Sequence, residues 1–205
     1  QEGADACLEA LQTADRMGLT ISCDLNVRKK LWNYGRSVAD VMLPLVQYSD
    51  VIFGAEPEYQ EVFGITPVGF QAVDTAYPLE LEGFEAFGQK ISHIVPRCRK
   101  VFLELRNTIT SNHNLLAAVL YSDQTLKYTG IYDITHEVDR VGTGDAFVGG
   151  MIYGLLTYPD NDQKALEFAL AASALKNTVY GDFNQVTVEE VESLMKGNTS
   201  GRVAR

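Results

Sequence analysis

Apolar and polar positions along the chain follow two periods, one typical of helices and one typical of short strands. The first segment, QEGADACLEALQTADRMG, has apolar residues at helical spacing and predicts an amphipathic helix. Two apolar runs with β-favouring residues, Leu19–Asn26 and Asp50–Gly54, predict strands, and the first of them should end near Asp24. Helical periodicity returns at residues 37–49, where Pro44 predicts an irregularity or an early end.

The rest of the chain continues this alternation. Glu56–Gly64 has proline in its first turn and glycine at its end, which predicts a short helix. A poorly periodic stretch at residues 65–78 predicts a loop, and a helix at 79–94 and a strand at 100–106 should follow. Leu115–Gly130 predicts two strands joined by a tight turn at Ser122–Gln124. Three further helices are expected at residues 144–158, 162–180 and 188–195.

Helices that alternate with short apolar strands indicate an α/β domain with a mainly parallel central sheet flanked by helices. Ligands of such sheets usually bind beyond the carboxyl ends of the strands. Three polar segments, DLNVR, LRNTITS and DRVGTGD, lie at such predicted ends. We therefore expect these segments to form the functional site.

The composition limits the class of protein and its partners. With 205 residues, 46% of them hydrophobic and 21% charged, the chain can bury one substantial core. Its formal net charge of -10 argues against a nucleic-acid partner and favours small molecules or proteins. No apolar run approaches the roughly 18 residues that cross a bilayer, so no membrane partner is expected. Three widely separated cysteines fit a reducing cytoplasm better than a disulfide framework or a zinc site.

The segment DRVGTGDAFVGG, residues 139–150, combines a glycine-rich turn, an aspartate and the start of a helix. Backbone N–H groups of residues 142–145 would be unpaired donors at the positive end of the helix dipole, which suits an anion such as phosphate. Asp145 cannot itself bind phosphate, but it could remove a proton from a hydroxyl that attacks the phosphate. Spacing alone equally fits an acidic first-turn residue that only stabilises the dipole. A dinucleotide fingerprint would need glycine where Phe147 stands, and no Walker A sequence occurs.

The sequence DRVGTGDAFVGGMIYGLL resembles the signature of ribokinase-like carbohydrate kinases of the phosphofructokinase-B type. Residues 22–32, 105–114 and 174–191 also resemble this family, and within it the kinases of 2-keto-3-deoxygluconate. The resemblance implies a three-layer ribokinase-like α/β fold. It implies that residues 1–196 are the carboxyl-terminal portion of a kinase domain, without the amino-terminal strands and lid of complete members, and that 197–205 are a flexible tail.

The resemblance assigns roles to the glycine-rich motif. In this family the aspartate of the GxGD motif is the catalytic base, and the backbone before it forms an anion hole for the transferred phosphoryl group. By resemblance, Asp145 is the base, and the anion hole is formed by Gly142, Thr143 and Gly144. Asp182, in a GD pair after an alanine-rich helix, matches a substrate-binding position in related kinases; without the resemblance it would be a residue of the turn after that helix.

The resemblance also assigns contacts in the other two segments. It implies that Arg28 binds the carboxylate of a sugar acid, which a guanidinium can contact in bidentate fashion, with Asn26 near the path of the phosphate. Without the resemblance, a surface arginine paired with an acid would be the commoner interpretation. RNTITS resembles the nucleotide-binding loop of the family, in which Arg106, Thr108 and Ser111 would contact ATP, although its composition alone also fits a plain loop.

Magnesium should accompany ATP, bound mostly by phosphates and water. Family members have an N-x-x-E segment that helps to organise this metal. Here the corresponding stretch is AEPE, in which Glu58 retains the acid and Ala55 replaces the asparagine, so Glu58 is expected to act on the metal indirectly. The three histidines share no ligand spacing, and a built-in metal site is not expected.

The activity that the resemblance implies is a sugar-acid kinase. It would transfer the γ-phosphoryl group of ATP to the 6-hydroxyl of 2-keto-3-deoxygluconate and release 2-keto-3-deoxy-6-phosphogluconate and ADP. Two alternatives remain open: a kinase of the same family that acts on a neutral sugar such as fructose, and a non-catalytic nucleotide-binding fragment. A homo-oligomer is compatible with the sequence but not specified by it.

Overall fold

The computed structural model describes residues 2–67 and 81–198, which belong to two compact units. Among the described residues, the first unit contains 2–67, 81–105 and 119–127, and the second contains 106–118 and 128–198. Most of the predicted loop at 65–78 and of the predicted tail at 197–205 lies outside the described residues.

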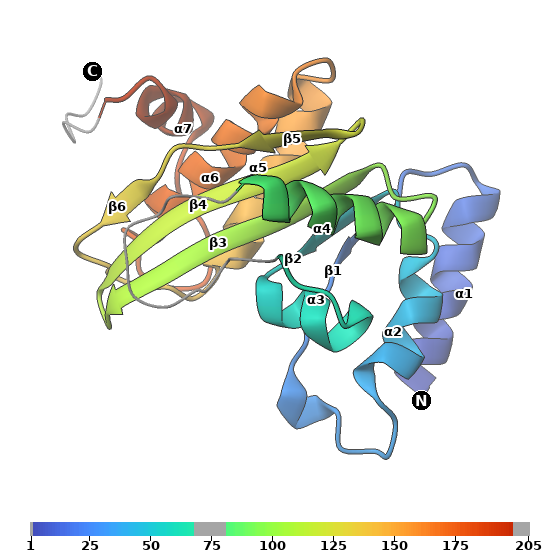
Figure 1. The fold of residues 1–205 in the computed structure, drawn as a ribbon. Helices are drawn as coiled ribbons and strands as arrows, with labels where there is room; N and C mark the ends of the chain where they lie inside the picture. The colour runs from blue at the N-terminus through green and yellow to red at the C-terminus, as the bar shows by residue number, and fades with distance from the viewer. Residues whose placement is uncertain (1, 68–80, 199–205) are drawn as a thin grey trace. The chain divides into compact units, whose positions relative to one another are not determined.

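The described residues form helices and strands in alternation (Figure 1). The helices are α1 (Glu2–Arg16), α2 (Val38–Val46), α3 (Glu56–Phe63), α4 (Leu81–Ile94), α5 (Thr143–Thr157), α6 (Asp162–Lys176) and α7 (Val188–Met195), with a short 3-10 helix at Lys29–Leu31. The strands are β1 (Ser22–Asp24), β2 (Val51–Gly54), β3 (Lys100–Thr110), β4 (His113–Ser122), β5 (Thr125–Tyr128) and β6 (Tyr132–Ile134). They are hydrogen-bonded in the order β1-β2-β3-β4-β5, and β6 pairs with β4.

The α/β class is confirmed, and the sheet is parallel where β1, β2 and β3 pair. The short strand β6 pairs with β4 in antiparallel fashion, and the sequence did not predict it. Asp123 and Gln124 both have positive φ angles in the turn between β4 and β5, as a tight hairpin turn requires. Among the described residues, no helix is long and apolar enough to cross a membrane.

Two predicted element ends, those of β3 and α6, were wrong. Strand β3 does not end at Arg106 but continues to Thr110, because its far half pairs within a long hairpin. Helix α6 ends at Lys176 instead of Tyr180, and Asn177 is its C-cap. Pro44 lies inside α2, and the helix ends at Val46, before the predicted residue 49, as the early end predicted at this proline allows.

Helix α3 is attached to the sheet of the first unit by a buried tyrosine. The hydroxyl of Tyr59 donates to Phe102 O at 2.6 Å, and its ring packs edge-on against Phe87 with centroids 4.9 Å apart. Phe102 in turn stacks on Phe53 of the neighbouring strand. Burial raises the pKa of Tyr59 well above its usual value, so the hydroxyl remains a donor. These contacts fix the position of α3, the helix that contains Glu58.

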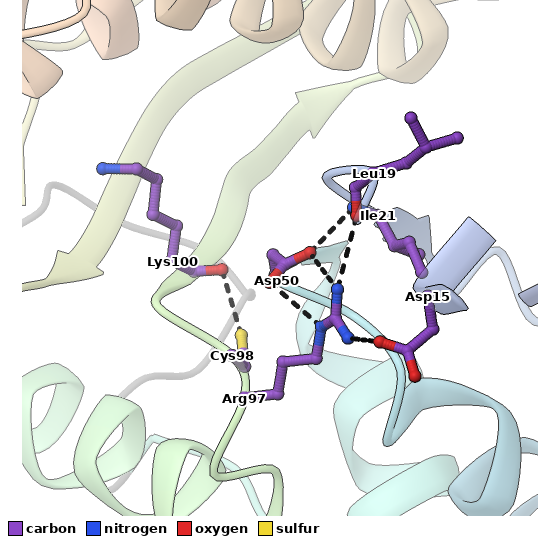
Figure 2. Close-up of polar contacts among 7 residues, drawn as sticks. All are labelled: Asp15, Leu19, Ile21, Asp50, Arg97, Cys98 and Lys100. Carbon is purple, nitrogen blue, oxygen red and sulfur yellow. Dashed lines mark hydrogen bonds and ion pairs between the residues drawn. The ribbon is translucent and has the colours of Figure 1, made fainter. Parts of the chain in front are cut away.

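Arg97 binds residues that lie just before the amino-terminal ends of the strands in the first unit (Figure 2). Arg97 donates to both carboxylate oxygens of Asp50, each at 3.0 Å, and also contacts Asp15 and Leu19 O. Asp50 accepts a further hydrogen bond from Ile21 N at 2.8 Å. Partial burial would raise the pKa of Asp50, but the hydrogen bonds from Arg97 and Ile21 outweigh it and lower this pKa. The ion pair therefore joins the end of α1 to the start of β2.

The second unit is built on closely packed helices, with α5 against α6 and α6 against α7 (Figure 1). Gly154 and Gly150 of α5 face α6, where a Cβ on Gly154 would lie 2.8 Å from the Cα of Ala165. Phe168 of α6 and Val191 of α7 are buried in one apolar cluster. Small residues thus let α5 approach α6 closely, and this packing fixes the axis of α5 and the direction of its first turn.

Candidate functional site

The glycine-rich motif forms the start of α5. Gly142 is the N-cap, with a φ of +79°, a left-handed conformation that glycine adopts without the strain of a Cβ. Its carbonyl accepts from Ala146 N at 2.9 Å, which begins the helical ladder. Thr143 N–H donates to Arg140 O at 3.3 Å, so the expectation that this amide is unpaired was wrong: the turn before the helix provides an acceptor. The helix dipole still makes this end of α5 favourable for an anion.

Asp145 lies exposed in the first turn of α5 and lines a cavity of about 470 Å³ within the second unit. The same cavity is lined by Gly142 and Asp182, so the structure brings together three of the residues that the sequence singled out. Phe183 and Tyr153 add aromatic surface to its wall. A carboxylate, the start of a helix and an apolar wall thus face one open space.

Asp182 approaches the N-cap of α5 so closely that only glycine fits there. A Cβ built on Gly142 would lie 2.1 Å from Asp182 O and 2.8 Å from Asp182 Oδ1. Real Cβ atoms do not make such contacts, so a side chain at 142 would displace the loop that contains Asp182. The glycine therefore sets both the angle of the turn and the distance between two candidate site residues.

Of the three residues of RNTITS that were assigned to nucleotide binding, one contacts the glycine-rich motif. Arg106 Nη2 donates to Thr143 Oγ1 at 2.6 Å, and this hydroxyl donates to Arg140 O at 2.9 Å. Thr108 instead donates to Asn114 across the hairpin, at 2.8 Å. Ser111 lies exposed in the two-residue connection after β3. RNTITS is thus mostly strand, and its arginine is held beside the first residue of α5.

Asp139 joins two segments beside the cavity, although the sequence assigned it no role. Its carboxylate accepts from Val141 N at 3.0 Å and from Gly181 N at 2.9 Å. These two backbone hydrogen bonds lower the pKa of Asp139. The carboxylate thereby joins the turn before α5 to the loop of Asp182. Its position within DRVGTGD could have indicated a role in the site. Its second partner, Gly181, is 42 residues away, so the sequence could not indicate that contact.

In the first unit, the DLNVR segment follows β1, as predicted, and is organised by Glu58. Glu58 Oε1 accepts from Val27 N at 3.1 Å, and Oε2 accepts from Ala55 N at 2.8 Å. Arg28 Nη1 lies 3.9 Å from Glu58 Oε1, and 63% of the Arg28 side chain is exposed. A carboxylate with these partners orders the start of α3 and the segment after β1. The structure thus gives Glu58 an observed role beside the indirect metal role, which stays a prediction.

Asn26 has a φ of +36°, and its amide lies 3.4 Å from Asp24 Oδ2. Asparagine tolerates this part of the left-handed region better than most residues. The conformation bends the chain directly after β1 and brings the following amide of Val27 to Glu58. Its proposed place near the path of a phosphate remains a prediction.

Residues 1–187 match the family described as pfkB family carbohydrate kinase, and the chain belongs to this family. A curated relative, 2-dehydro-3-deoxygalactonokinase of Haloferax volcanii, is 30% identical over 195 residues, which are 94% of this chain and 52% of the relative. The crystal structure of 2-dehydro-3-deoxygluconokinase from Thermotoga maritima is 34% identical, with a TM-score of 0.84 over 96% of this chain and 57% of that one.

A second similar structure supports the fold alone. It is that of a putative 2-keto-3-deoxygluconate kinase from Enterococcus faecalis, which is 22% identical, with a TM-score of 0.80. The match covers 98% of this chain and 57% of the Enterococcus faecalis chain. The chain thus spans about half the length of the relatives that it matches. The ribokinase-like fold and the carbohydrate-kinase family predicted from the sequence are confirmed.

Proposed function

We propose that this protein is an ATP-dependent kinase that phosphorylates the 6-hydroxyl of 2-keto-3-deoxygluconate. The observation that supports this proposal best is the cavity that Asp145, Gly142 and Asp182 line together at the start of α5. Its carboxylate could accept a proton, and the helix start beside it could bind a phosphoryl group. A base and a site for the transferred group are two of the parts that phosphoryl transfer from ATP to an alcohol uses.

In the proposed reaction, Asp145 accepts the proton of the 6-hydroxyl while the hydroxyl oxygen forms a bond to the γ-phosphorus of ATP. The bond between that phosphorus and the oxygen that bridges to the β-phosphate breaks, and ADP leaves with the electron pair. Backbone amides in the first turn of α5, including that of Gly144, and the positive end of the helix dipole stabilise the charge on the phosphoryl oxygens. Mg²⁺ would arrive on the phosphates of ATP and neutralise part of their charge.

The proposed substrate class depends on Arg28. Its guanidinium is mostly exposed, and at 3.9 Å from Glu58 it keeps donors available for a substrate carboxylate. Two relatives at 30% and 34% identity are named as kinases of 2-keto-3-deoxy sugar acids that differ in the configuration of one carbon. Both acids have the same carboxylate. An Arg28 contact therefore supports a sugar-acid substrate but does not select between the two epimers. Asp182, which lines the cavity, would contact the sugar hydroxyls.

A substrate panel tests this proposal. Purified protein is assayed for ADP release with 2-keto-3-deoxygluconate, its galactonate epimer and fructose, in wild type, Arg28→Ala and Lys30→Ala. Lys30 is an exposed cation of the same segment and serves as the matched control. Loss of a charged hydrogen bond costs about 1.5–3 kcal/mol, so Arg28→Ala should raise the KM for the sugar acid roughly 10- to 100-fold and leave the KM for ATP nearly unchanged.

The sugar-acid assignment fails if wild type phosphorylates fructose best, or if Arg28→Ala and Lys30→Ala behave alike. A preference for the galactonate epimer would keep the class and replace the particular substrate. Absence of turnover in wild type with all three sugars would favour the non-catalytic alternative.

A further inference from the structure

Lysine 176 is the last residue of α6 and is completely buried, with 0% of its surface exposed. Lysine is almost never fully buried unless it has a partner. The Nζ of Lys176 donates to Val179 O at 3.0 Å, within the loop that leads to Asp182. Nothing in the proposed reaction uses this ammonium, so its burial requires another explanation.

The loop at residues 177–182 is hydrogen-bonded to the turn before α5 at two places. Asn177 O accepts from Val138 N at 2.8 Å and from Asp139 N at 3.3 Å. Four residues further on, Gly181 N donates to the carboxylate of Asp139. The backbone hydrogen bonds from Val141 and Gly181 lower the pKa of Asp139 most, and the positive charge of Lys176 lowers it further. Lys176 thus donates to a carbonyl of the loop, and its charge acts on the acid that joins the loop to the turn.

We propose that Lys176 is a positioning residue for phosphoryl transfer. Its buried ammonium maintains the conformation of residues 177–182 in which Asp139 binds Gly181 and Asp182 lies against Gly142. The turnover effect rests on the proposed function, whereas the effect on the loop does not.

Burial of a charge costs free energy, and an apolar side chain of similar volume often packs as well or better. A methionine at 176 should therefore preserve the packing at the end of α6. It cannot donate to Val179 O or attract Asp139, however. Lys176→Met separates the role of the ammonium from the role of the side-chain volume.

Hydrogen exchange and kinetics of Lys176→Met test the proposal, with Lys196→Met as the control at an exposed position in the C-cap of α7. We expect Lys176→Met to unfold at nearly the wild-type temperature. Exchange of the Gly181 amide should accelerate about tenfold or more, because this hydrogen bond lies in a loop that opens locally. The kcat should fall about tenfold or more, with smaller changes in both KM values, since displacement of reacting groups acts mainly on the transition state. Lys196→Met should change none of these quantities.

Wild-type exchange at Gly181 together with wild-type kcat in Lys176→Met would overturn the proposal. If this variant does not fold, Lys176→Gln decides, because it lacks the charge of the ammonium and keeps a polar side chain. Acceleration at Gly181 in Lys176→Gln supports the proposal, and unchanged exchange there overturns it. If wild type has no kinase activity, the proposed function fails, while exchange at Gly181 still tests the role of Lys176.

Discussion

Gly142→Ala is the substitution whose effect follows most directly from the geometry of the site. The φ of +79° places residue 142 in the left-handed region, which costs a residue with a Cβ about 1–2 kcal/mol. The new methyl group would also lie 2.1 Å from Asp182 O. Forcing a carbon into a packed position typically costs a further 1–3 kcal/mol or so. We therefore expect a loss of about 2–5 kcal/mol of unfolding free energy if the loop does not move, by the sum of these two effects.

The loop can relieve part of this cost by moving Asp182 away from the turn, and that displacement should appear in catalysis. A shift of about 1 Å in reacting groups can reduce the rate roughly 100-fold. Urea unfolding and coupled ADP release, measured on the same preparations, give both quantities. Gly64→Ala is the matched control, because Gly64 has a φ of +67° and no atom within 4 Å of a built Cβ. It should lose only the cost of the backbone angle, about 1–2 kcal/mol, and should retain wild-type kcat.

The reasoning would be refuted if Gly142→Ala matched Gly64→Ala in stability and wild type in turnover. Such a result would mean that the close approach of Asp182 to the start of α5 has no energetic or catalytic consequence.

Three further predictions concern residues around the site and in the core. Tyr59→Phe should lower the unfolding free energy by about 1–3 kcal/mol, because it leaves the buried carbonyl of Phe102 without this donor; urea denaturation measures this change. Since the folded-state pKa of Asp50 is lowered, its stabilisation is complete above its unfolded pKa of about 4 and is lost as the pH falls through the lower folded pKa. Arg97→Met should therefore flatten the acid limb of stability against pH in urea titrations, and an unchanged acid limb would contradict this. Thr143→Val removes the hydroxyl that accepts from the guanidinium on β3, and we expect kcat to fall about tenfold or more; an unchanged kcat would show that this contact does not affect turnover.

The start of α5 could be predicted from the sequence because its signals are local. Glycine at a helix start and a following acid are features of a few adjacent residues, and α5 does begin at Thr143. Helix α7 was also placed correctly at Val188–Met195, where Thr187 and Glu190 form a capping box. Such elements are specified by hydrogen bonds within one turn.

The remaining part of the site depends on contacts between distant residues. RNTITS reads as a loop by composition, yet residues 106–110 are strand, because pairing in the hairpin overrides local propensity. Asp139 has one partner two residues away and another in a separate loop. Lys176 looks like an ordinary basic residue at the end of a helix, and only the fold shows that it is buried. Neither pattern nor spacing contains this information.

The central claim is that Asp145 accepts the proton of the attacking hydroxyl, and single-turnover transfer of the γ-phosphoryl group measures this most directly. General-base catalysis typically contributes about 10²- to 10⁴-fold, so Asp145→Asn should slow this step by that factor while both ligands still bind. Transfer by Asp145→Asn at the wild-type rate would contradict the claim.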